Sequence, residues 1–151
     1  MSKKVYEENE KNNEKTVTLG GTKLNLLKPK ISMKSTLNSK PDLKIQSITL
    51  DQQNRIVVEV KNSANVGLDI SHWAGSDQPY LNLKLNGNNW ANVYLNGIDT
   101  DQKLAQPNGI VYYNTGYQIQ KNTTVKAEID AGNTITEVNE NNNSLEVSLK
   151  P

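Results

Sequence analysis

The residues best suited to metal chemistry in this chain are four oxygen donors near its C-terminal end. Calcium prefers six to eight such oxygens, and surface loops of extracellular domains often supply them. The spacing matches no EF-hand, however, and Asn and Asp side chains also fasten turns by bonding nearby backbone groups. Two interpretations are therefore open, a calcium site or a self-fastened turn, for Asp130, Glu137, Asn139 and Glu140.

Candidate catalytic residues are few. His72 is the only histidine, cysteine is absent, and no Gly-x-Ser-x-Gly motif occurs. Asp99 and Asp101 flank Thr100 and would point the same way from a strand, as a carboxylate pair. The sequence indicates no third catalytic side chain beside these two carboxylates. The interpretation is that these acids lie on an exposed loop and that the chain has no catalytic residue.

Aromatic residues offer a third kind of chemistry, the stacking of flat rings on sugars. The chain has 2 Trp, 6 Tyr and no Phe, so some of these rings must fill the core. Trp90 and Tyr94 share one strand parity, and Ala91 and Val93 share the other. If the small residues face inward, the two rings are exposed together. With Trp73, they form a candidate polysaccharide platform.

The elements that must position these residues are strands. From residue 43 onward, apolar and polar residues alternate with period two, which is typical of half-buried strands. A slip in the alternation over residues 43–50 indicates a β-bulge. Asn86-Gly87 and Asn96-Gly97 are hairpin-turn signals on either side of a short strand, residues 90–95. No stretch has helical periodicity over three turns.

The predicted fold is all-β, an immunoglobulin-like antiparallel β-sandwich of about seven to eight strands. Strand parity predicts which side chains form its core. They are Val58, Val60, Leu83, Val125, Ala127, Ile129, Leu145 and Val147. Ile135 and Val138 are expected to plug one end of this core, and Asn142 or Asn143 to bond the backbone at the sheet edge.

A sequence repeat links the two ends of the chain. The closing motif, Glu137–Asn143, has the form Glu-x-Asn-Glu-x-Asn-Asn and recurs as Glu7–Asn13, 130 positions earlier. A fixed offset of this size is typical of tandem modules. The predicted organisation is the tail of a preceding repeat (residues 1–27), a linker (28–41) and one complete module (42–150).

The repeat extends into the strand that follows the motif. Val17 and Leu19 occupy the places of Val147 and Leu149. Residues 16–19 and 22–27 are expected to form two short strands around Gly20-Gly21. Because Val17 and Leu19 repeat core-facing positions, we expect this segment to pair with the edge of a sheet.

The complete module resembles the CARDB family, the cell-adhesion-related domains of bacteria and archaea. The resemblance is carried mainly by the closing motif, with support from Pro41-Asp42-Leu43, Val60–Ser63 and Ala127–Asp130. It implies a seven-stranded immunoglobulin-like or fibronectin-III-like sandwich, often in tandem on secreted proteins, without catalytic residues. Residues 65–104 depart from it by extra loop sequence, where binding functions often lie.

These observations predict a non-catalytic adhesion or spacer module of a secreted or cell-surface protein, bacterial or archaeal. Its expected partners are neighbouring copies or other surface proteins. The alternatives are a carbohydrate-binding module of a glycan-active enzyme, and a fibre subunit assembled by strand addition. No basic stripe interleaves with aromatics, so no nucleic acid is expected. No run of eighteen apolar residues occurs, so no membrane insertion is expected, and no cofactor apart from possible calcium.

Overall fold

The structure is a computed structural model, and it describes residues 18–19, 22–23 and 40–151. Internal contacts divide the chain into two units, Met1–Ser35 and Thr36–Pro151. In the first unit, β1 (Thr18–Leu19) pairs antiparallel with β2 (Thr22–Lys23), and Leu19 lies opposite Thr22. This agrees with two short strands around Gly20-Gly21. Val17 and most of the predicted strand lie outside the described residues.

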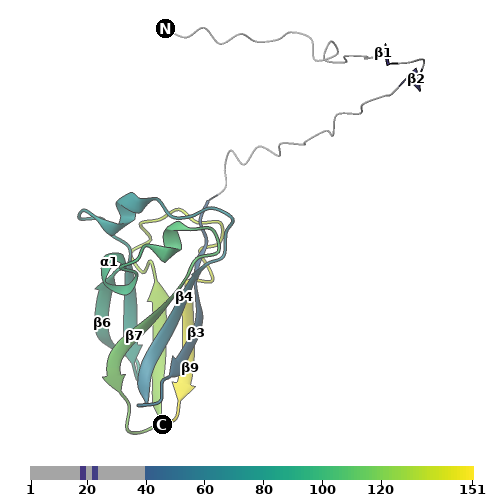
Figure 1. The fold of residues 1–151 in the computed structure, drawn as a ribbon. Coiled ribbons are helices and arrows are strands. Elements are labelled where there is room, and N and C mark those ends of the chain that lie inside the picture. The colour runs from purple at the N-terminus through teal and green to yellow at the C-terminus, as the bar shows by residue number, and fades with distance from the viewer. Residues whose placement is uncertain (1–17, 20–21, 24–39) are drawn as a thin grey trace. The chain divides into compact units, whose positions relative to one another are not determined.

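The second unit is a β-sandwich of seven strands in two antiparallel sheets (Figure 1). One sheet has the order β3-β4-β7 and the other β6-β5-β8-β9, so the predicted immunoglobulin-like sandwich is confirmed. The strands are β3 (Leu43–Leu50), β4 (Arg55–Asn62), β5 (Tyr80–Leu85), β6 (Asn88–Tyr94), β7 (Ile110–Gln118), β8 (Thr123–Ile129) and β9 (Ser144–Leu149).

The core lies between the two sheets. Six of the eight predicted core residues have 0–1% of their surface exposed, namely Val58, Val60, Leu83, Val125, Ala127 and Ile129. Leu145 and Val147 pack against this core but are only half-buried. They lie on β9, an edge strand that is covered on fewer sides than a central strand.

The bulge predicted in the first strand is present, because the β3–β4 register shifts between Ile45 and Ser47. The Asn86-Gly87 turn is also confirmed, since both residues have positive φ (48° and 82°), as a type I′ hairpin requires. The second hairpin prediction is wrong. Asn96 and Gly97 lie inside the short helix α1 (Leu95–Ile98), because Leu95 and Ile98 bury themselves in the core.

The extra sequence of residues 65–104 contributes to one end of the core. Besides β5, β6 and α1 it contains two 3₁₀ turns, η2 (Ile70–Trp73) and η3 (Lys103–Ala105). Its buried residues outside the strands include five large hydrophobic ones, namely Leu68, Trp73, Leu95, Ile98 and Leu104. The extension is therefore a packed cap on the sandwich as well as a set of loops.

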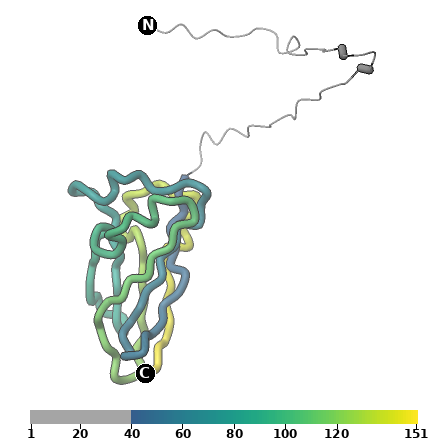
Figure 2. Tube along the Cα trace, in the orientation of Figure 1, coloured from purple at the N-terminus to yellow at the C-terminus, as the bar shows by residue number. Residues whose placement is uncertain are grey.

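The chain enters the sandwich at one end and leaves at the other (Figures 1 and 2). Strand β3 begins beside the loop that follows β8, and the C-terminus lies at the opposite end. Within the described part of the chain, no helix has the length and apolarity needed to cross a membrane.

Candidate functional site

The closing motif forms a latch on the first strand of the sandwich. Glu137 is 4% exposed, and its carboxylate accepts hydrogen bonds from the backbone N–H of Leu43 and from Nδ2 of Asn143, the latter at 2.7 Å. Burial raises the pKa of Glu137 to about 7. The bonds from Leu43 and Asn143 oppose this rise, and the neighbouring Glu140 and Asp130 carboxylates add to it.

Two further bonds complete this latch. Asn142 Nδ2 donates to Asp42 Oδ1 at 3.0 Å, and the Val138 N–H donates to the Pro41 carbonyl at 2.9 Å. The sequence predicted a side-chain bond from Asn142 or Asn143 to the backbone, but both amides bond carboxylates instead. The Val138 side chain does not plug the core, because it is 66% exposed. Ile135 does, at 4% exposed.

The other candidate calcium donors also accept hydrogen bonds from groups within the same loop. Asp130 is buried, and its carboxylate accepts from the N–H groups of Thr134 (3.0 Å) and Ile135 (2.9 Å). Glu140 Oε1 accepts from the Glu137 N–H at 2.8 Å.

Asn139 Oδ1 accepts a further bond from the Asn141 N–H, at 3.1 Å. Among residues 18–19, 22–23 and 40–151, no group of three or more His, Cys, Asp or Glu side chains is arranged to hold a metal ion. The loop geometry favours the self-fastened turn over the calcium interpretation for the four candidate donors.

Asp99 and Asp101 do not form a carboxylate pair. The prediction of an exposed loop acid is wrong for Asp99, which is 1% exposed because its carboxylate accepts from the N–H groups of Lys103 (2.9 Å) and Leu104 (2.8 Å) at the start of η3. Asp101 is exposed. The segment leaves α1 in a turn, so the i, i+2 geometry of a strand does not apply. His72 lies in η2 beside Trp73, on a surface loop.

The candidate platform of Trp73, Trp90 and Tyr94 is not one surface. Trp73 is 7% exposed, and its Nε1–H donates to the Asp99 carbonyl at 2.7 Å, so it belongs to the core. Trp90 and Tyr94 are exposed, at 38% and 55%, as strand parity predicts. Each, however, packs against a different ring.

A β-bulge separates Trp90 from Tyr94. In the β5–β6 register Leu83 lies opposite Ala91 and Lys84 opposite Asn89, so Trp90 has no partner on β5. Bulges re-aim side chains out of the strand alternation. Tyr94 stays on the outer face of its sheet and meets Tyr80 edge to face, with ring centroids 6.2 Å apart.

The partner of Trp90 is Tyr117, on the edge strand of the other sheet. Their ring centroids are 5.1 Å apart at an interplanar angle of 64°, an edge-to-face contact. Strand β7 bulges here too, because Val57 pairs with Asn114 while Arg55 pairs with Gln118. Two bulges, one on each sheet, therefore bring an exposed aromatic pair together across the side of the sandwich.

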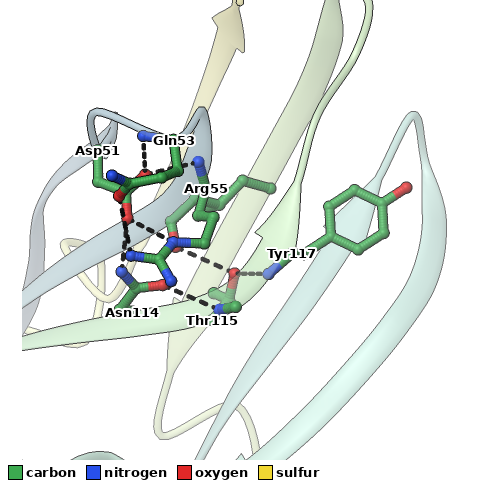
Figure 3. Close-up of polar contacts among 8 residues, drawn as sticks. Asp51, Gln53, Arg55, Asn114, Thr115 and Tyr117 are labelled. Atoms are coloured by element: carbon green, nitrogen blue, oxygen red, sulfur yellow. Dashed lines mark hydrogen bonds and ion pairs between the residues drawn. The ribbon is translucent and has the colours of Figure 1, made fainter.

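A polar network holds the β7 bulge (Figure 3). Asn114 Nδ2 donates to Asp51 Oδ2 at 2.8 Å, and Asn114 Oδ1 accepts from the Gly116 N–H at 2.9 Å. Thr115 Oγ1 accepts from the Tyr117 N–H at 3.1 Å. Gly116 adopts φ 73°, a conformation that glycine reaches without strain. The Tyr117 ring points away from this network.

Asp51 is the anchor of the network. Its carboxylate also accepts from Arg55 Nε at 2.7 Å and from the Arg55 and Gln53 N–H groups, each at 2.9 Å. Desolvation raises the pKa of Asp51, but the hydrogen bonds from Arg55, Asn114 and Gln53 outweigh it and lower the pKa to about 2. The carboxylate is thus ionised at neutral pH and fixes the turn between β3 and β4.

The two bulged edges form a surface that we call the uncharged flank, strands β6 and β7. Neither strand contains a charged residue, although 22% of the chain is charged. Five of the chain's eight aromatic residues lie on them, namely Trp90, Tyr94, Tyr112, Tyr113 and Tyr117. The absence of charge was readable in the sequence, but nothing in the sequence placed the two strands side by side.

The structural role of Asn62 was also not anticipated from the sequence. It is fully buried at the end of β4, and its amide oxygen accepts from the N–H groups of Asp42 (3.2 Å) and Ala64 (3.1 Å). Its Nδ2 donates to the Val66 carbonyl at 2.7 Å and to the Leu104 carbonyl at 3.2 Å. It therefore ties the start of β3 to the cap on the same end as the latch.

No family model matches the chain, and no curated protein matches it. Among solved structures, the chain is similar to a crystal structure described as the CARDB domain of the PF1109 protein from Pyrococcus furiosus in complex with di-metal ions. The two sequences are 20% identical, the match covers 75% of this chain and 94% of that chain, and the TM-score is 0.49.

A solution NMR structure of the same Pyrococcus furiosus domain is also similar. It is 21% identical, with 75% of this chain and 96% of that chain covered and a TM-score of 0.45. Both structures are described as CARDB domains.

Proposed function

We propose that this chain is a non-catalytic adhesion and spacer module of a secreted or cell-surface protein, bacterial or archaeal, built from tandem copies. The observation that carries the proposal is the latch. The motif that the sequence repeats 130 positions apart is the one that fastens the closing loop to Asp42 and Leu43, where the chain enters the sandwich. A repeated motif that fastens the first strand, β3, is what a tandem array of such modules would need.

The buried acids support a structural assignment. Asp99, Asp130 and Glu137 are each 1–4% exposed, and each carboxylate is occupied by backbone N–H groups or an amide. A general acid or base needs access to a substrate proton. These carboxylates face the protein's own loops instead.

The path of the chain supports the spacer role. Tension on a tandem protein would pull on the start of β3 at one end and on the end of β9 at the other (Figure 1). The latch bonds join the pulled residues, Pro41 to Leu43, to the closing loop. They must break before β3 can be drawn out.

Single-molecule pulling between the two ends of residues 40–151 tests this proposal. We expect one discrete unfolding event, and a lower unfolding force for Glu137→Ala than for the wild type. Glu146→Ala, which removes an exposed carboxylate on β9, should leave the force unchanged. Extension without a discrete event would refute the spacer role.

A fibre subunit is a second candidate, supported by the repetition of Val147 and Leu149 as Val17 and Leu19. Among the edge strands of the sandwich, β9 pairs with its neighbour without a register shift, so its outer edge is regular enough to accept a strand. Sedimentation of the full chain against a variant lacking residues 1–27 tests it. Assembly of the full chain that grows with protein concentration, and that the variant lacking residues 1–27 does not show, supports a fibre. If both proteins sediment as monomers, the fibre candidate is removed.

A further inference from the structure

We propose that one part of the uncharged flank, the Trp90–Tyr117 pair with an adjoining groove, binds a neutral polysaccharide. The inference rests on the proposed adhesion function and names the ligand class for it. Its starting point is the composition of the flank. Strands β6 and β7 lack charge altogether, and they carry exposed aromatic and amide side chains.

A groove of ≈ 480 Å³ lies beside Tyr117, between the β5–β6 turn and the loop from β7 to β8. This volume is within the range of small-ligand sites, about 300–1,000 Å³. Three of its lining residues are exposed amides, Asn86, Gln118 and Gln120. Leu85 adds apolar surface.

Amides and aromatic rings suit a neutral sugar chain. Gln118 and Gln120 each offer a donor and an acceptor, as each sugar hydroxyl does, so the two match in either direction. Asn86 offers mainly its donor, because its Oδ1 already accepts from the Thr124 N–H at 2.9 Å. Rings of Trp and Tyr provide flat apolar area together with a polar tip. Lys121 is the one charged residue in the groove lining, so the site has no cluster of charges that would select an acidic or basic polymer.

The two bulges favour side-chain recognition over strand addition at this flank. An edge strand accepts another strand through a regular row of N–H and C=O groups. Here β6 is interrupted at Trp90 and β7 at residues 115–117, and such interruptions twist an edge away from pairing. The same interruptions turn the two rings toward each other across the flank.

The aromatic pair is also held in place before any ligand arrives. The Asp51–Asn114–Gly116 bonds fix the β7 bulge from which Tyr117 projects (Figure 3). A side chain that is already ordered loses little conformational entropy on binding. Stacking on this pair is therefore less costly than stacking on an exposed ring that no second ring contacts, such as Tyr112, which is 67% exposed.

Affinity electrophoresis of the full chain tests the proposal, in gels containing soluble mixed-linkage β-glucan, xylan, galactomannan, starch or, as an acidic comparison, polygalacturonate. We expect retardation by at least one neutral polymer. Trp90→Ala should weaken that retardation about tenfold, the scale of one lost stacking contact. Gln120→Ala, a change on an exposed loop that leaves the fold intact, should weaken it as well.

Tyr94→Ala and Tyr112→Ala are matched controls, since both remove an exposed tyrosine from the same two strands but not from the groove. They should bind as the wild type does. The proposal is overturned if no neutral polymer retards the chain, if only polygalacturonate does, or if the controls lose as much binding as Trp90→Ala and Gln120→Ala. Any of these results leaves the pulling experiment, and with it the spacer role, unaffected.

Discussion

The latch and the uncharged flank use polar side chains in opposite ways. At the latch, Glu137 and Asn143 are buried and bond each other and the backbone. At the flank, Gln118 and Gln120 are exposed beside an open groove. Buried polar groups that are satisfied internally stabilise a fold, whereas exposed ones remain available to a partner. The internally bonded polar groups of the latch thus lie at the entry end of the sandwich, and the exposed amides lie on the side, where we propose that a ligand binds.

The largest expected effect is at the latch. Glu137→Ala removes the acceptor of the Leu43 N–H and of the Asn143 amide, and leaves both buried donors unpaired. The free energy of unfolding should fall by about 2–4 kcal/mol. Urea denaturation of the wild type and the variant measures the difference.

Glu146→Ala is the control for this change, because that carboxylate is exposed on β9. Its free energy of unfolding should stay within about 0.5 kcal/mol of the wild type. Equal losses in both variants would remove the distinction between the latch and an ordinary surface acid.

The pH dependence of stability is the next largest effect. Glu137 has a pKa of about 7 in the fold against 4.5 ordinarily, so between these values the folded state holds a proton that the unfolded state has lost. Its contribution to stability is therefore full below pH 4.5 and is lost as the pH rises through 7. The loss should be about 3 kcal/mol.

Glu137→Gln isolates this contribution. Oδ1 of Asn143 is buried without a hydrogen-bond partner among the described residues, so a flip of that amide provides an acceptor for a glutamine N–H. The variant should fold with a flatter stability profile between about pH 5 and pH 8, as a titrating group is removed. Urea denaturation midpoints of the wild type and the variant, measured at several pH values in this range, test the prediction. If the stability of both proteins changes with pH in the same way, Glu137 does not titrate in this range.

A smaller effect is expected at the flank. Gly116→Ala places a side chain at φ 73° in open space, which should cost about 1 kcal/mol through backbone strain. Gly75→Ala is the matched control, with φ 88° and equally open space in an exposed loop. Both should lose similar stability, but only Gly116→Ala should weaken polysaccharide retardation, because it displaces Tyr117. Equal binding by the two variants would contradict the positioning role of the bulge.

Calcium should have the smallest effect of all. The carboxylates of Asp130, Glu137 and Glu140 are already bonded to the protein. Excess calcium should therefore leave the melting temperature unchanged, as differential scanning fluorimetry would show. A rise that a chelator reverses would show that the loop opens to bind the ion.

The sequence predicted the sandwich because strand alternation is a local property of side chains. The burial of Val58, Leu83 and Ile129 follows directly from their parity. Leu145 and Val147 are less buried than predicted, since a sequence does not reveal which strand will lie at an edge.

The candidate site was harder to predict because it depends on irregularities. Strand parity placed Trp90 with Tyr94, and a single inserted residue in β6 separated them. The partner of Trp90 is 27 positions away on another sheet, and no local pattern indicates such a contact. The Asn-rich motif was read correctly as a fastening, but its bonding partner, the strand β3, is far away in sequence.

The two ends of residues 40–151 lie at opposite ends of the sandwich (Figure 1), and this affects how far the module extends when it is pulled. While folded, the module adds little more than the length of its strands, about 26 Å for an eight-residue strand such as β3. Once β3 is freed and the sandwich opens, its roughly 110 residues can extend to about 370 Å. In the tandem array proposed above, each copy that unfolds under tension would therefore extend to more than ten times its folded length.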